Sequence, residues 1–457
     1  MRGLWSTLAA AACVVVLGSN EGAAQAPAAV TPAAASVQGR DPALAAEYEA
    51  LFRQILINPA NLDANFRFAE IATQIGDFEA AIGALERILF YNPNLPRVRL
   101  ELGILYFRLG SYAMARQYFE SAVAGSDVPE AVTFRVRAFL AEIDRRTSTT
   151  QWSFYGQTGF RYQTNATAGP SNPLVRVLGF DATLDRRFTR RPDWNVFALG
   201  TLRHIYDFEN QRGDLWETSV VTYNTRQFQV SRLNVNLFEV QTGPRLALAP
   251  ESLPGAYVRP YLVGGAIALG DSFYLGSLGG GVAVGATFGT FQVEPFAEIR
   301  QRDFNNSSQY RAATDQNGLL MSTGVLFGSP LTGSLRWQSC LAFSRNETET
   351  RFAFYSYDQA TAEIALPFEF AGPWGSRPWV LTPYGGYTFT SYDRPNPIVD
   401  PGVRREDREW RVGAGIDLPV YQNIGLGAQI TYSRADSNIR NFRNENLAVS
   451  FGPTIRF

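Results

Sequence analysis

The chain has 457 residues and a formal net charge of −1, with 41 basic residues against 42 acidic ones. This length predicts at least two structural units, and the balanced charge gives no reason to expect a nucleic-acid partner. The chain has a single histidine, and one histidine with the one cysteine left after removal of a signal peptide cannot supply an ordinary zinc shell, so we expect neither a metal nor another cofactor. Forty glycines and 20 tyrosines beside 18% charged residues favour a β-rich protein.

The amino terminus has the composition of a secretory signal. Arg2 supplies a short positive region, and residues 8–17 form an apolar run of suitable length followed by small residues. We therefore expect a signal peptide over residues 1–26. The alternative, that Cys13 is a lipoprotein cysteine, is disfavoured because the apolar run continues beyond it. After cleavage Cys340 would be the only cysteine left, which excludes an internal disulfide.

A repeat follows a short segment rich in alanine and proline. Residues 27–40 are predicted to be a flexible tether, and from residue 41 to residue 147 the apolar spacing becomes helical. Within 41–147, small, aromatic and apolar residues recur 34 positions apart, as Gly76 and Gly110 do. The predicted packing positions of the repeats are Ala69, Gly76, Phe78, Ala81, Leu85, Pro93, Gly103, Gly110, Tyr112, Ala115 and Phe119.

This period resembles the tetratricopeptide repeat, in which small residues lie where two helices touch and a proline ends the unit. We expect two full repeats, a half repeat before them and a capping helix over residues 129–146. Arrays of this kind form a short α-solenoid with a concave binding surface, so the segment is predicted to bind a peptide or protein in the periplasm. The alternative is a passive spacer.

The last residues of the chain alternate between apolar and polar positions. The apolar set of residues 447–457 ends at the carboxy-terminal Phe457, and the opposite face is small or polar. The same alternation recurs along residues 151–457, for example in 410–420 and 424–432. No apolar run reaches the roughly 18 residues that a membrane helix needs, so strands would have to span the membrane. Residues 151–457 are therefore predicted to form an antiparallel transmembrane β-barrel in the outer membrane of a Gram-negative bacterium.

Charged residues occupy the face opposite the apolar one. They would be costly in a dry core, whereas a water-filled lumen tolerates them, so this pattern favours a membrane barrel over a soluble sandwich. The predicted lumen-facing residues are Asp181, Asp185, Glu294, Glu298, Arg300, Arg336, Arg411, Asp417 and Arg456.

Loop lengths indicate the direction of the strands, because long connections are expected outside the cell and short ones in the periplasm. Counting back from the end makes residues 236–248 the eleventh strand, and counting forward from residue 151 makes residues 215–228 the fourth. Both would then run in the same direction, so we expect one of them to belong to a loop. The total is predicted to be 14 strands, with 16 as the alternative. The long connections are 165–173, 305–317, 393–407 and 435–446, and the short ones are 190–193, 288–290 and 421–423.

Every scheme for an enzymatic barrel would have to use His204, the single histidine. No serine or aspartate is tied to it by a recognisable motif, so we expect a structural role at the membrane interface and no enzyme activity. The glycines of residues 278–281 lie in a strand-like stretch and not before a helix, which excludes a phosphate loop. They are expected to let the wall bend or to leave room inside the barrel.

Four stretches make the chain resemble the surface lipoprotein assembly modulator family. They are WSFYGQTGFRYQTNA at the first strand, VQTGPRLAL, YVRPYLVGGAIALGDSFY, and the closing ITYSR…NLAVSFGPTIRF. Together with the repeats they extend the likeness over nearly the whole mature chain. The resemblance implies a repeat segment joined to an outer-membrane barrel that helps client proteins, often lipoproteins, to cross the outer membrane.

We therefore expect the repeats to bind a client protein or lipoprotein in the periplasm. The barrel would contact outer-membrane lipid and provide the exit route. One alternative is an exopolysaccharide export porin, which a lumen with aromatic platforms and one sign of charge would favour, and another is a passive porin. The terminal Phe457 is predicted to be a signal that the barrel insertion machinery recognises.

Overall fold

The computed structural model describes residues 42–125, 130–249, 251–374 and 377–457. The predicted signal peptide and tether lie outside these residues, as does Pro129 at the predicted start of the capping helix. The chain divides between Ser148 and Thr149 into a helical unit and a strand unit. Among the helices that the structure describes, none is long and apolar enough to cross a membrane.

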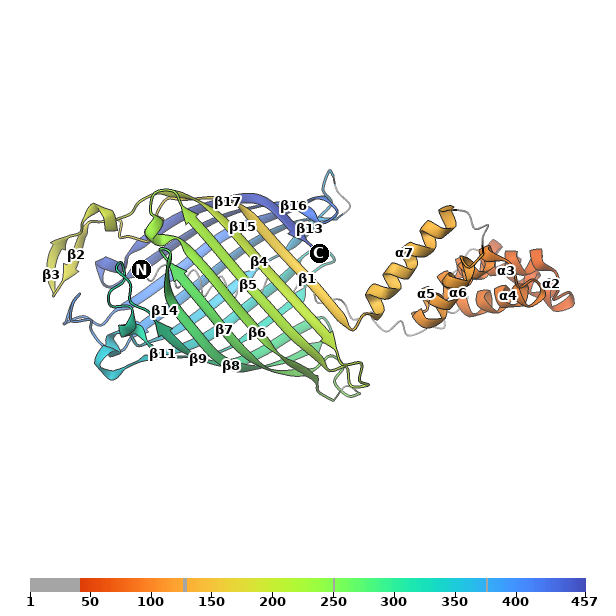
Figure 1. Cartoon of the computed structure of the whole chain (residues 1–457), viewed down its shortest axis with the longest axis horizontal. Coiled ribbons are helices and arrows are strands. Elements are labelled where there is room, and N and C mark those ends of the chain that lie inside the picture. The colour runs from red at the N-terminus through yellow and green to blue at the C-terminus, as the bar shows by residue number, and fades with distance from the viewer. Residues whose placement is uncertain (1–41, 126–129, 250, 375–376) are drawn as a thin grey trace. The chain divides into compact units, whose positions relative to one another are not determined.

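The helical unit consists of successive antiparallel helix pairs (Figure 1). The helices α3, α5 and α7 start at residues 62, 96 and 130, and α4 and α6 start at 78 and 112, so equivalent helices are 34 residues apart. The pairs α3–α4 and α5–α6 are therefore two tetratricopeptide-like repeats, α2 is the half repeat before them, and α7 takes the place of the first helix of a third. The helices are α2 (Pro42–Ile57), α3 (Leu62–Ile75), α4 (Phe78–Tyr91), α5 (Pro96–Arg108), α6 (Tyr112–Ala122) and α7 (Glu130–Thr147).

The glycines at the predicted repeat positions have two different roles. Gly76 and Gly110 have φ angles of 81° and 75° just beyond α3 and α5, where the chain turns and a side chain would be strained. Gly103 instead lies inside α5, where an added Cβ would be 2.6 Å from the ring of Phe119 on α6. The residues buried at the other predicted positions are Ala69, Ala81, Leu85, Ala115 and Phe119, while Phe78 and Tyr112 are partly buried and Pro93 is exposed.

The strand unit is a closed antiparallel barrel of 14 strands, which confirms the smaller of the two predicted numbers. Each strand of the barrel pairs with the next barrel strand along the chain, and the last pairs with the first. The short β13 (Phe368–Phe370) adds to β14 without forming part of the circuit. The barrel strands are β1 (Thr150–Gln163), β4 (Asp193–Asp207), β5 (Leu215–Gln227), β6 (Val235–Ala247), β7 (Tyr257–Leu269), β8 (Ser272–Phe288), β9 (Phe291–Phe304), β10 (Gly318–Pro330), β11 (Arg336–Thr348), β12 (Tyr357–Ala365), β14 (Trp379–Tyr392), β15 (Glu406–Tyr421), β16 (Ile424–Ser437) and β17 (Asn444–Arg456).

The expectation that one of two neighbouring segments belongs to a loop is wrong, because β5 and β6 both belong to the barrel wall. Counting forward made residues 215–228 the fourth strand, but β5 is the third strand of the barrel. The miscount arises from the segment that contains β2 (Leu174–Val177) and β3 (Phe180–Thr183), which form a separate two-stranded sheet. Leu178 and Gly179 join them in a tight turn with φ angles of 51° and 82°. Residues 190–192 of the predicted short turn 190–193 belong with this hairpin to the long connection between β1 and β4, and Asp193 begins β4.

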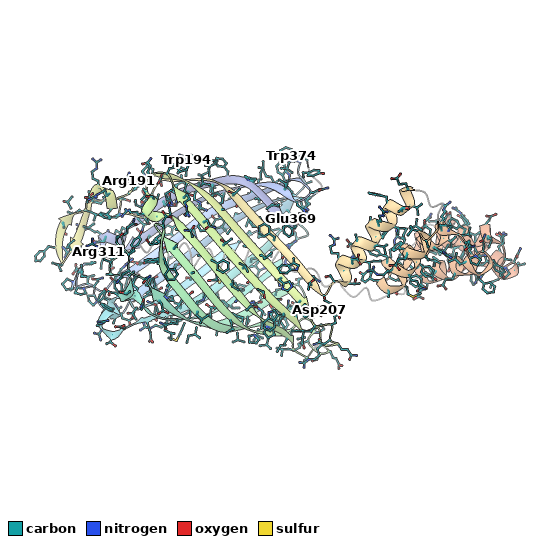
Figure 2. All side chains as sticks on the ribbon, in the orientation of Figure 1. Arg191, Trp194, Asp207, Arg311, Glu369 and Trp374 are labelled. Atoms are coloured by element: carbon teal, nitrogen blue, oxygen red, sulfur yellow. The ribbon has the colours of Figure 1, made fainter. Side chains whose placement is uncertain are left out.

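Side chains alternate between the two faces of the wall. The outward face carries large apolar side chains that are exposed in the isolated chain, such as Leu262 and Leu278 at 67% and 70%. The inward face carries the polar and charged residues described below. Figure 2 shows side chains along the whole wall, with Trp194 and Asp207 at opposite ends of β4. This outward apolar belt is the surface that a bilayer would cover.

The connections differ between the two ends of the barrel. The end where β1 finishes carries the long connections 164–192, 305–317 and 393–405, together with one tight turn at 270–271. The opposite end carries the tight turns 289–290 and 422–423, and its longest connection, 366–378, includes β13. The chain enters the barrel and leaves it at this second end, which we call the terminal end.

Candidate functional site

Eight charged side chains on the inner face of strands β4 to β9 form ion pairs with one another, and we call this group the charged wall. Glu217 on β5 lies 3.2 Å from the guanidinium of Arg203 on β4 and 3.2 Å from that of Arg245 on β6. The two cations compensate a carboxylate that is only 11% exposed and would be costly to bury alone. The charged wall consists of Arg203, Glu217, Glu239, Arg245, Arg259, Glu294, Glu298 and Arg300.

The other ion pairs of the charged wall mostly join strands that are not neighbours. Arg259 on β7 lies 3.1 Å from Glu294 on β9, with β8 between them. Arg300 on β9 reaches Glu239 on β6 at 2.5 Å, across both β7 and β8, and it also contacts Glu298 of its own strand. To make such contacts the side chains must lie along the wall. Four arginines and four glutamates therefore neutralise one another at the surface of the lumen.

Glycines on β8 make room for the aromatic members of this inner face. An added Cβ would lie 2.6 Å from the ring of Tyr261 at Gly281 and 2.2 Å from the ring of Tyr257 at Gly285. The hydroxyl of each tyrosine donates a hydrogen bond to a glutamate of β9. The sequence led us to expect that the glycines of residues 278–281 let the wall bend or leave room inside, and at Gly281 the ring of Tyr261 occupies the space that a side chain would need.

The wall formed by β12, β14 and β15 contains the most buried ion pair of the barrel interior. Arg411 on β15 lies 2.6 Å from Glu363 on β12, and their side chains are only 10% and 4% exposed. Gly386, on the strand between them, leaves space for the glutamate, since an added Cβ would lie 3.2 Å from its Cγ. Asp417 and Arg456 form a further pair at 2.9 Å near the terminal end.

A stripe without charge separates the two charged regions. The hydroxyls of Ser322 on β10 and Ser344 on β11 lie 2.9 Å apart on the inner face of the wall. Between residues 320 and 326 and between 338 and 344, the positions on this face carry small, apolar or amide side chains. The lumen therefore combines both signs of charge with a neutral stripe. Along the wall that the structure describes, the lumen is not lined by charges of one sign only.

Two of the predicted lumen residues lie elsewhere. Asp181 is on β3 and pairs with Arg176 at 3.1 Å, and Asp185 is the residue before a short 3-10 helix, where its carboxylate accepts a hydrogen bond from the backbone N–H of Arg187. Both belong to the connection between β1 and β4, so their assignment to the lumen is wrong. β2 and β3 have only four residues each, and over so short a length a strand in a connection has the same alternation as the beginning of a spanning strand. The sequence pattern therefore does not distinguish the two.

The other predicted lumen residues lie on the inner face or at its terminal end. Arg336 pairs with Glu369 at 2.8 Å and lines a pocket at the terminal end together with Arg377. Several residues of the site were not predicted, although Tyr257, Arg259 and Tyr261 alternate in the sequence YVRPYLV as inward residues should. The predicted residues on the inner face are Glu294, Glu298 and Arg300 in the charged wall and Arg411, Asp417 and Arg456 opposite, and those missed are Arg203, Glu217, Glu239, Arg245, Arg259 and Glu363.

His204 lies on the outward face near the terminal end of β4. Its ring stacks on that of Trp152 on β1, with 4.1 Å between the centroids. Trp152 itself is 56% exposed, and Tyr206 on the same face is 41% exposed. Aromatic side chains in this position are typical of the girdle at a membrane interface.

The helical unit exposes two equivalent apolar pairs. Leu56 and Ile57 end α2, and Phe90 and Tyr91 end α4, so that the pairs are 34 residues apart and occupy the same repeat position. The exposed fractions of Ile57 and Phe90 are 86% and 81%. We call these four residues the apolar pairs. Exposed aromatic and aliphatic side chains at regular spacing are typical of a surface that binds another protein.

Comparison of the chain with known protein families gives no match, and comparison with curated proteins gives none. The barrel is similar to a loop-deletion mutant of OmpT, an outer membrane protein of Vibrio cholerae, at 11% identity over 68% of this chain and 100% of that one, with a TM-score of 0.35. The helical unit is similar to MamA at 17% identity over 22% of this chain, with a TM-score of 0.20, and spans about half (53%) of that protein. It is also similar to PcrH, solved in complex with the chaperone binding region of PopD, at 17% identity over 23% of this chain and 82% of that one, with a TM-score of 0.22. These TM-scores are low, so the fold described above rests on the helices and strands of this chain itself.

Proposed function

We propose that the protein is an outer-membrane translocation factor, in which the helical unit binds client proteins in the periplasm and the barrel gives them a route across the membrane. The observation that carries the proposal is the direct connection of the two units. Only residues 148 and 149 separate α7 from β1. The chain therefore passes from the last helix of the repeats, to which we assign client binding, directly into the first strand of the barrel.

The orientation follows from the connections. Barrels of the outer membrane keep short turns in the periplasm and long loops outside, so the terminal end, with the turns 289–290 and 422–423, faces the periplasm. The helical unit then lies on the side from which clients arrive. The apolar pairs, which expose Ile57 and Phe90, are the surface we assign to client binding.

The lumen favours a polypeptide over a sugar polymer as the substrate. A route for an acidic polysaccharide would be lined by one sign of charge and by aromatic platforms, whereas the charged wall is balanced and the tyrosines Tyr257 and Tyr261 are held by glutamates. A surface with both signs of charge beside a neutral stripe can pass polypeptide segments of varied composition. Clients that are lipoproteins, as the family resemblance implies, are the finer form of the same proposal.

The proposal is tested by deleting the gene and labelling surface proteins with a membrane-impermeant biotin reagent. We expect at least one protein to keep its total amount and to lose its surface labelling. Loss of surface polysaccharide with unchanged protein labelling would instead identify a polymer exporter. Unchanged labelling and unchanged polysaccharide would leave a passive porin and contradict translocation.

A further inference from the structure

The barrel closes where its first strand, β1, meets its last, β17. No loop joins these two strands, whereas a connection ties every other pair of neighbouring strands of the circuit in chain order. We call this boundary the seam. In the barrel that the structure describes, the strands of the seam can separate without stretching a connection, whereas the strands of the other pairs are held together by one.

Backbone pairing across the seam is interrupted near its centre. Phe154 and Phe457 exchange backbone hydrogen bonds of 2.8 and 3.0 Å, and hydrogen-bonded pairs then recur at every second residue of an antiparallel ladder. This alternation places Thr158 opposite Pro453 at a hydrogen-bonding position, but proline has no N–H to donate. The paired register accordingly stops at Gln157 and resumes at Phe160.

The ladders on either side of the seam, β1–β4 and β16–β17, are continuous. The β6–β7 and β8–β9 ladders are also interrupted, between Thr242 and Leu246 and between Ala283 and Ala286, but a covalent connection joins the strands of each of these pairs. Between β1 and β4 the register includes every residue from Thr150 to Gln163. Even β12, the shortest strand of the circuit, pairs without interruption with β11 and with β14. The seam therefore combines two weaknesses, a missing covalent connection and a missing hydrogen-bond donor in mid-membrane.

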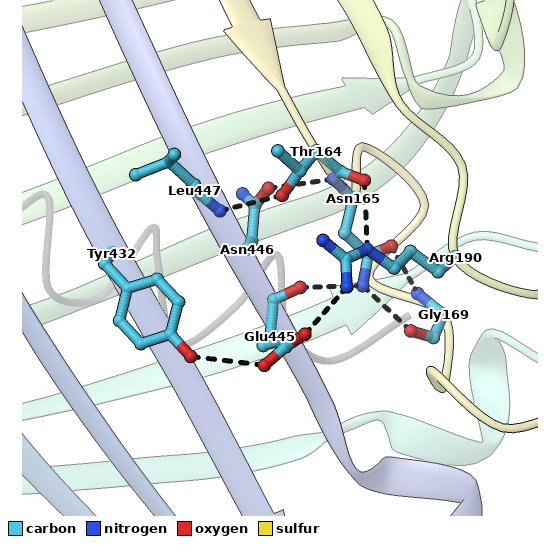
Figure 3. Close-up of polar contacts among 8 residues, drawn as sticks. All are labelled: Thr164, Asn165, Gly169, Arg190, Tyr432, Glu445, Asn446 and Leu447. Carbon is cyan, nitrogen blue, oxygen red and sulfur yellow. Dashed lines mark hydrogen bonds and ion pairs between the residues drawn. The ribbon is translucent and has the colours of Figure 1, made fainter.

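A polar latch holds the seam at its outer end (Figure 3). The side chain of Asn165 donates a hydrogen bond to the backbone carbonyl of Glu445 at 3.1 Å, and its backbone N–H donates to Asn446 at 2.9 Å. Arg190 lies 2.7 Å from the carboxylate of Glu445. The backbone N–H of Leu447 donates to the Thr164 hydroxyl at 2.9 Å. All these contacts join the connection after β1 to the start of β17.

An aromatic contact holds the inner end. The rings of Phe154 and Phe457 stack with 5.3 Å between their centroids, beside the two backbone hydrogen bonds that these residues exchange. The seam is thus fastened at both ends and weak between them. Such an arrangement can open in the middle, or from the outer end once the latch is released.

We propose that the wall opens laterally at the seam and connects the polar lumen with the surrounding bilayer. This inference rests on the proposed function and concerns how a client with an attached apolar anchor leaves the lumen. The lumen is lined by ion pairs such as Arg300–Glu239, so it offers an apolar anchor little apolar surface to contact. The outward face of the barrel, in contrast, is apolar. An anchored substrate that enters the lumen therefore needs a passage through the wall to reach the lipid.

The physical part of the proposal is tested by hydrogen exchange of the full chain in lipid nanodiscs, read residue by residue by mass spectrometry. The amides of Gly156, Phe160 and Tyr162 face β17, whereas those of the odd-numbered residues of β1 face β4. We expect the first set to exchange about tenfold faster or more. Pro453→Ala, which restores the donor, should slow their exchange, and Asn165→Ala should accelerate it at Tyr162. Equal protection of both sets of amides would overturn the proposal.

The functional part is tested with a disulfide across the seam. Gln157 and Thr454 are a non-hydrogen-bonded pair with inward side chains, which brings their Cα atoms to a distance that a disulfide can bridge. The variant Gln157→Cys, Thr454→Cys would be made in a Cys340→Ala background. The matched control, Thr201→Cys with Val221→Cys, occupies the equivalent pairing between β4 and β5.

Both variants are introduced into the deletion strain and surface proteins are labelled as above. Oxidation of the seam variant should abolish the labelling of the proteins lost on deletion, a reductant should restore it, and the control should label like the wild type. Normal labelling with a quantitative seam disulfide would overturn the lateral opening and leave translocation standing. Translocation itself fails only if deletion changes no surface protein, so the two failures are distinguishable.

Discussion

Arg300 on β9 lies 2.5 Å from Glu239 on β6, so one ion pair connects strands that have two others between them. Side chains that bridge this distance must lie along the wall, which Gly279 and Gly265 on the intervening strands permit, since neither carries a side chain at the crossing. Charge in this barrel is therefore balanced at its wall while the centre of the lumen is left free of these side chains. This arrangement leads to a prediction about ion selectivity.

Replacing Arg300 by Met should make the lumen prefer cations. The charged wall has four positive and four negative side chains, and the variant leaves one negative charge in excess next to Glu239 and Glu298. Reversal potentials across planar bilayers with a salt gradient measure the change. Arg351→Met is the matched control, because that arginine pairs with Glu349 in an exposed loop at the outer end. An unchanged reversal potential, or a barrel that conducts no ions, would contradict the account of the lumen.

Replacing Gly103 by Ala should destabilise the helical unit. The added methyl would lie 2.6 Å from the ring of Phe119, which is fully buried, and overpacking of this kind costs about 1–3 kcal/mol. Gly83, inside α4, is the matched control, because an added Cβ meets nothing within 4 Å there. Gly83→Ala should stabilise the unit by up to about 1 kcal/mol through helix propensity. Thermal melting followed by circular dichroism at the helical band measures both, and equal melting temperatures would contradict the proposed packing.

The stability of the helical unit should fall at high pH partly through Tyr48. Burial and the hydrogen bond that its hydroxyl donates to Asp77, 2.9 Å long, raise the pKa of Tyr48 to about 12. A phenol whose pKa is raised by folding stabilises the fold fully below its unfolded pKa of about 10 and loses this contribution as the pH rises to about 12. Tyr48→Phe should therefore flatten the decline in melting temperature over this interval. Tyr91→Phe, at an exposed position, should leave the pH profile unchanged, and an equal flattening in both variants would count against the assignment.

Deleting Phe457 should lower the amount of barrel that reaches the membrane. The residue supplies two backbone hydrogen bonds and a stacked ring at the inner end of the seam, where no loop holds the strands together. Phe451→Leu is the matched control, because Phe451 is also an outward aromatic residue of β17 and is away from the strand end. Quantifying heat-modifiable barrel in outer-membrane fractions measures insertion. Normal insertion of the deletion variant would refute this role.

The repeat spacing and the alternation of the strands could be predicted from the sequence because both follow from local geometry. Gly103 and Phe119 were placed by a period of 34 residues, and the face of each barrel strand by a period of two. The partners in the lumen could not be predicted, because the sequence does not state which residue of β6 lies level with Arg300 of β9. The hairpin that contains Asp181 was misread for a similar reason. Only the pairing partners distinguish a short strand in a loop from the start of a spanning one.

The glycines of β8 were the signal that could have located part of the site. Gly279, Gly281 and Gly285 fall on one face at even spacing, and a row of missing side chains on an inward face marks where neighbouring large side chains lie. The rings of Tyr257 and Tyr261 occupy that space. In barrels of this type, inward glycines therefore indicate where large inward side chains of the neighbouring strands, such as tyrosine or arginine, lie along the wall.

The central claim is that the helical unit and the barrel act together on client proteins. It is tested most directly in the deletion strain by comparing complementation with the full chain and with a chain that lacks residues 42–147, using surface labelling and the total amount of each protein. Both chains should insert a barrel, and only the full chain should restore the surface labelling of the proteins lost on deletion. Restoration of that labelling by the barrel alone would contradict the claim.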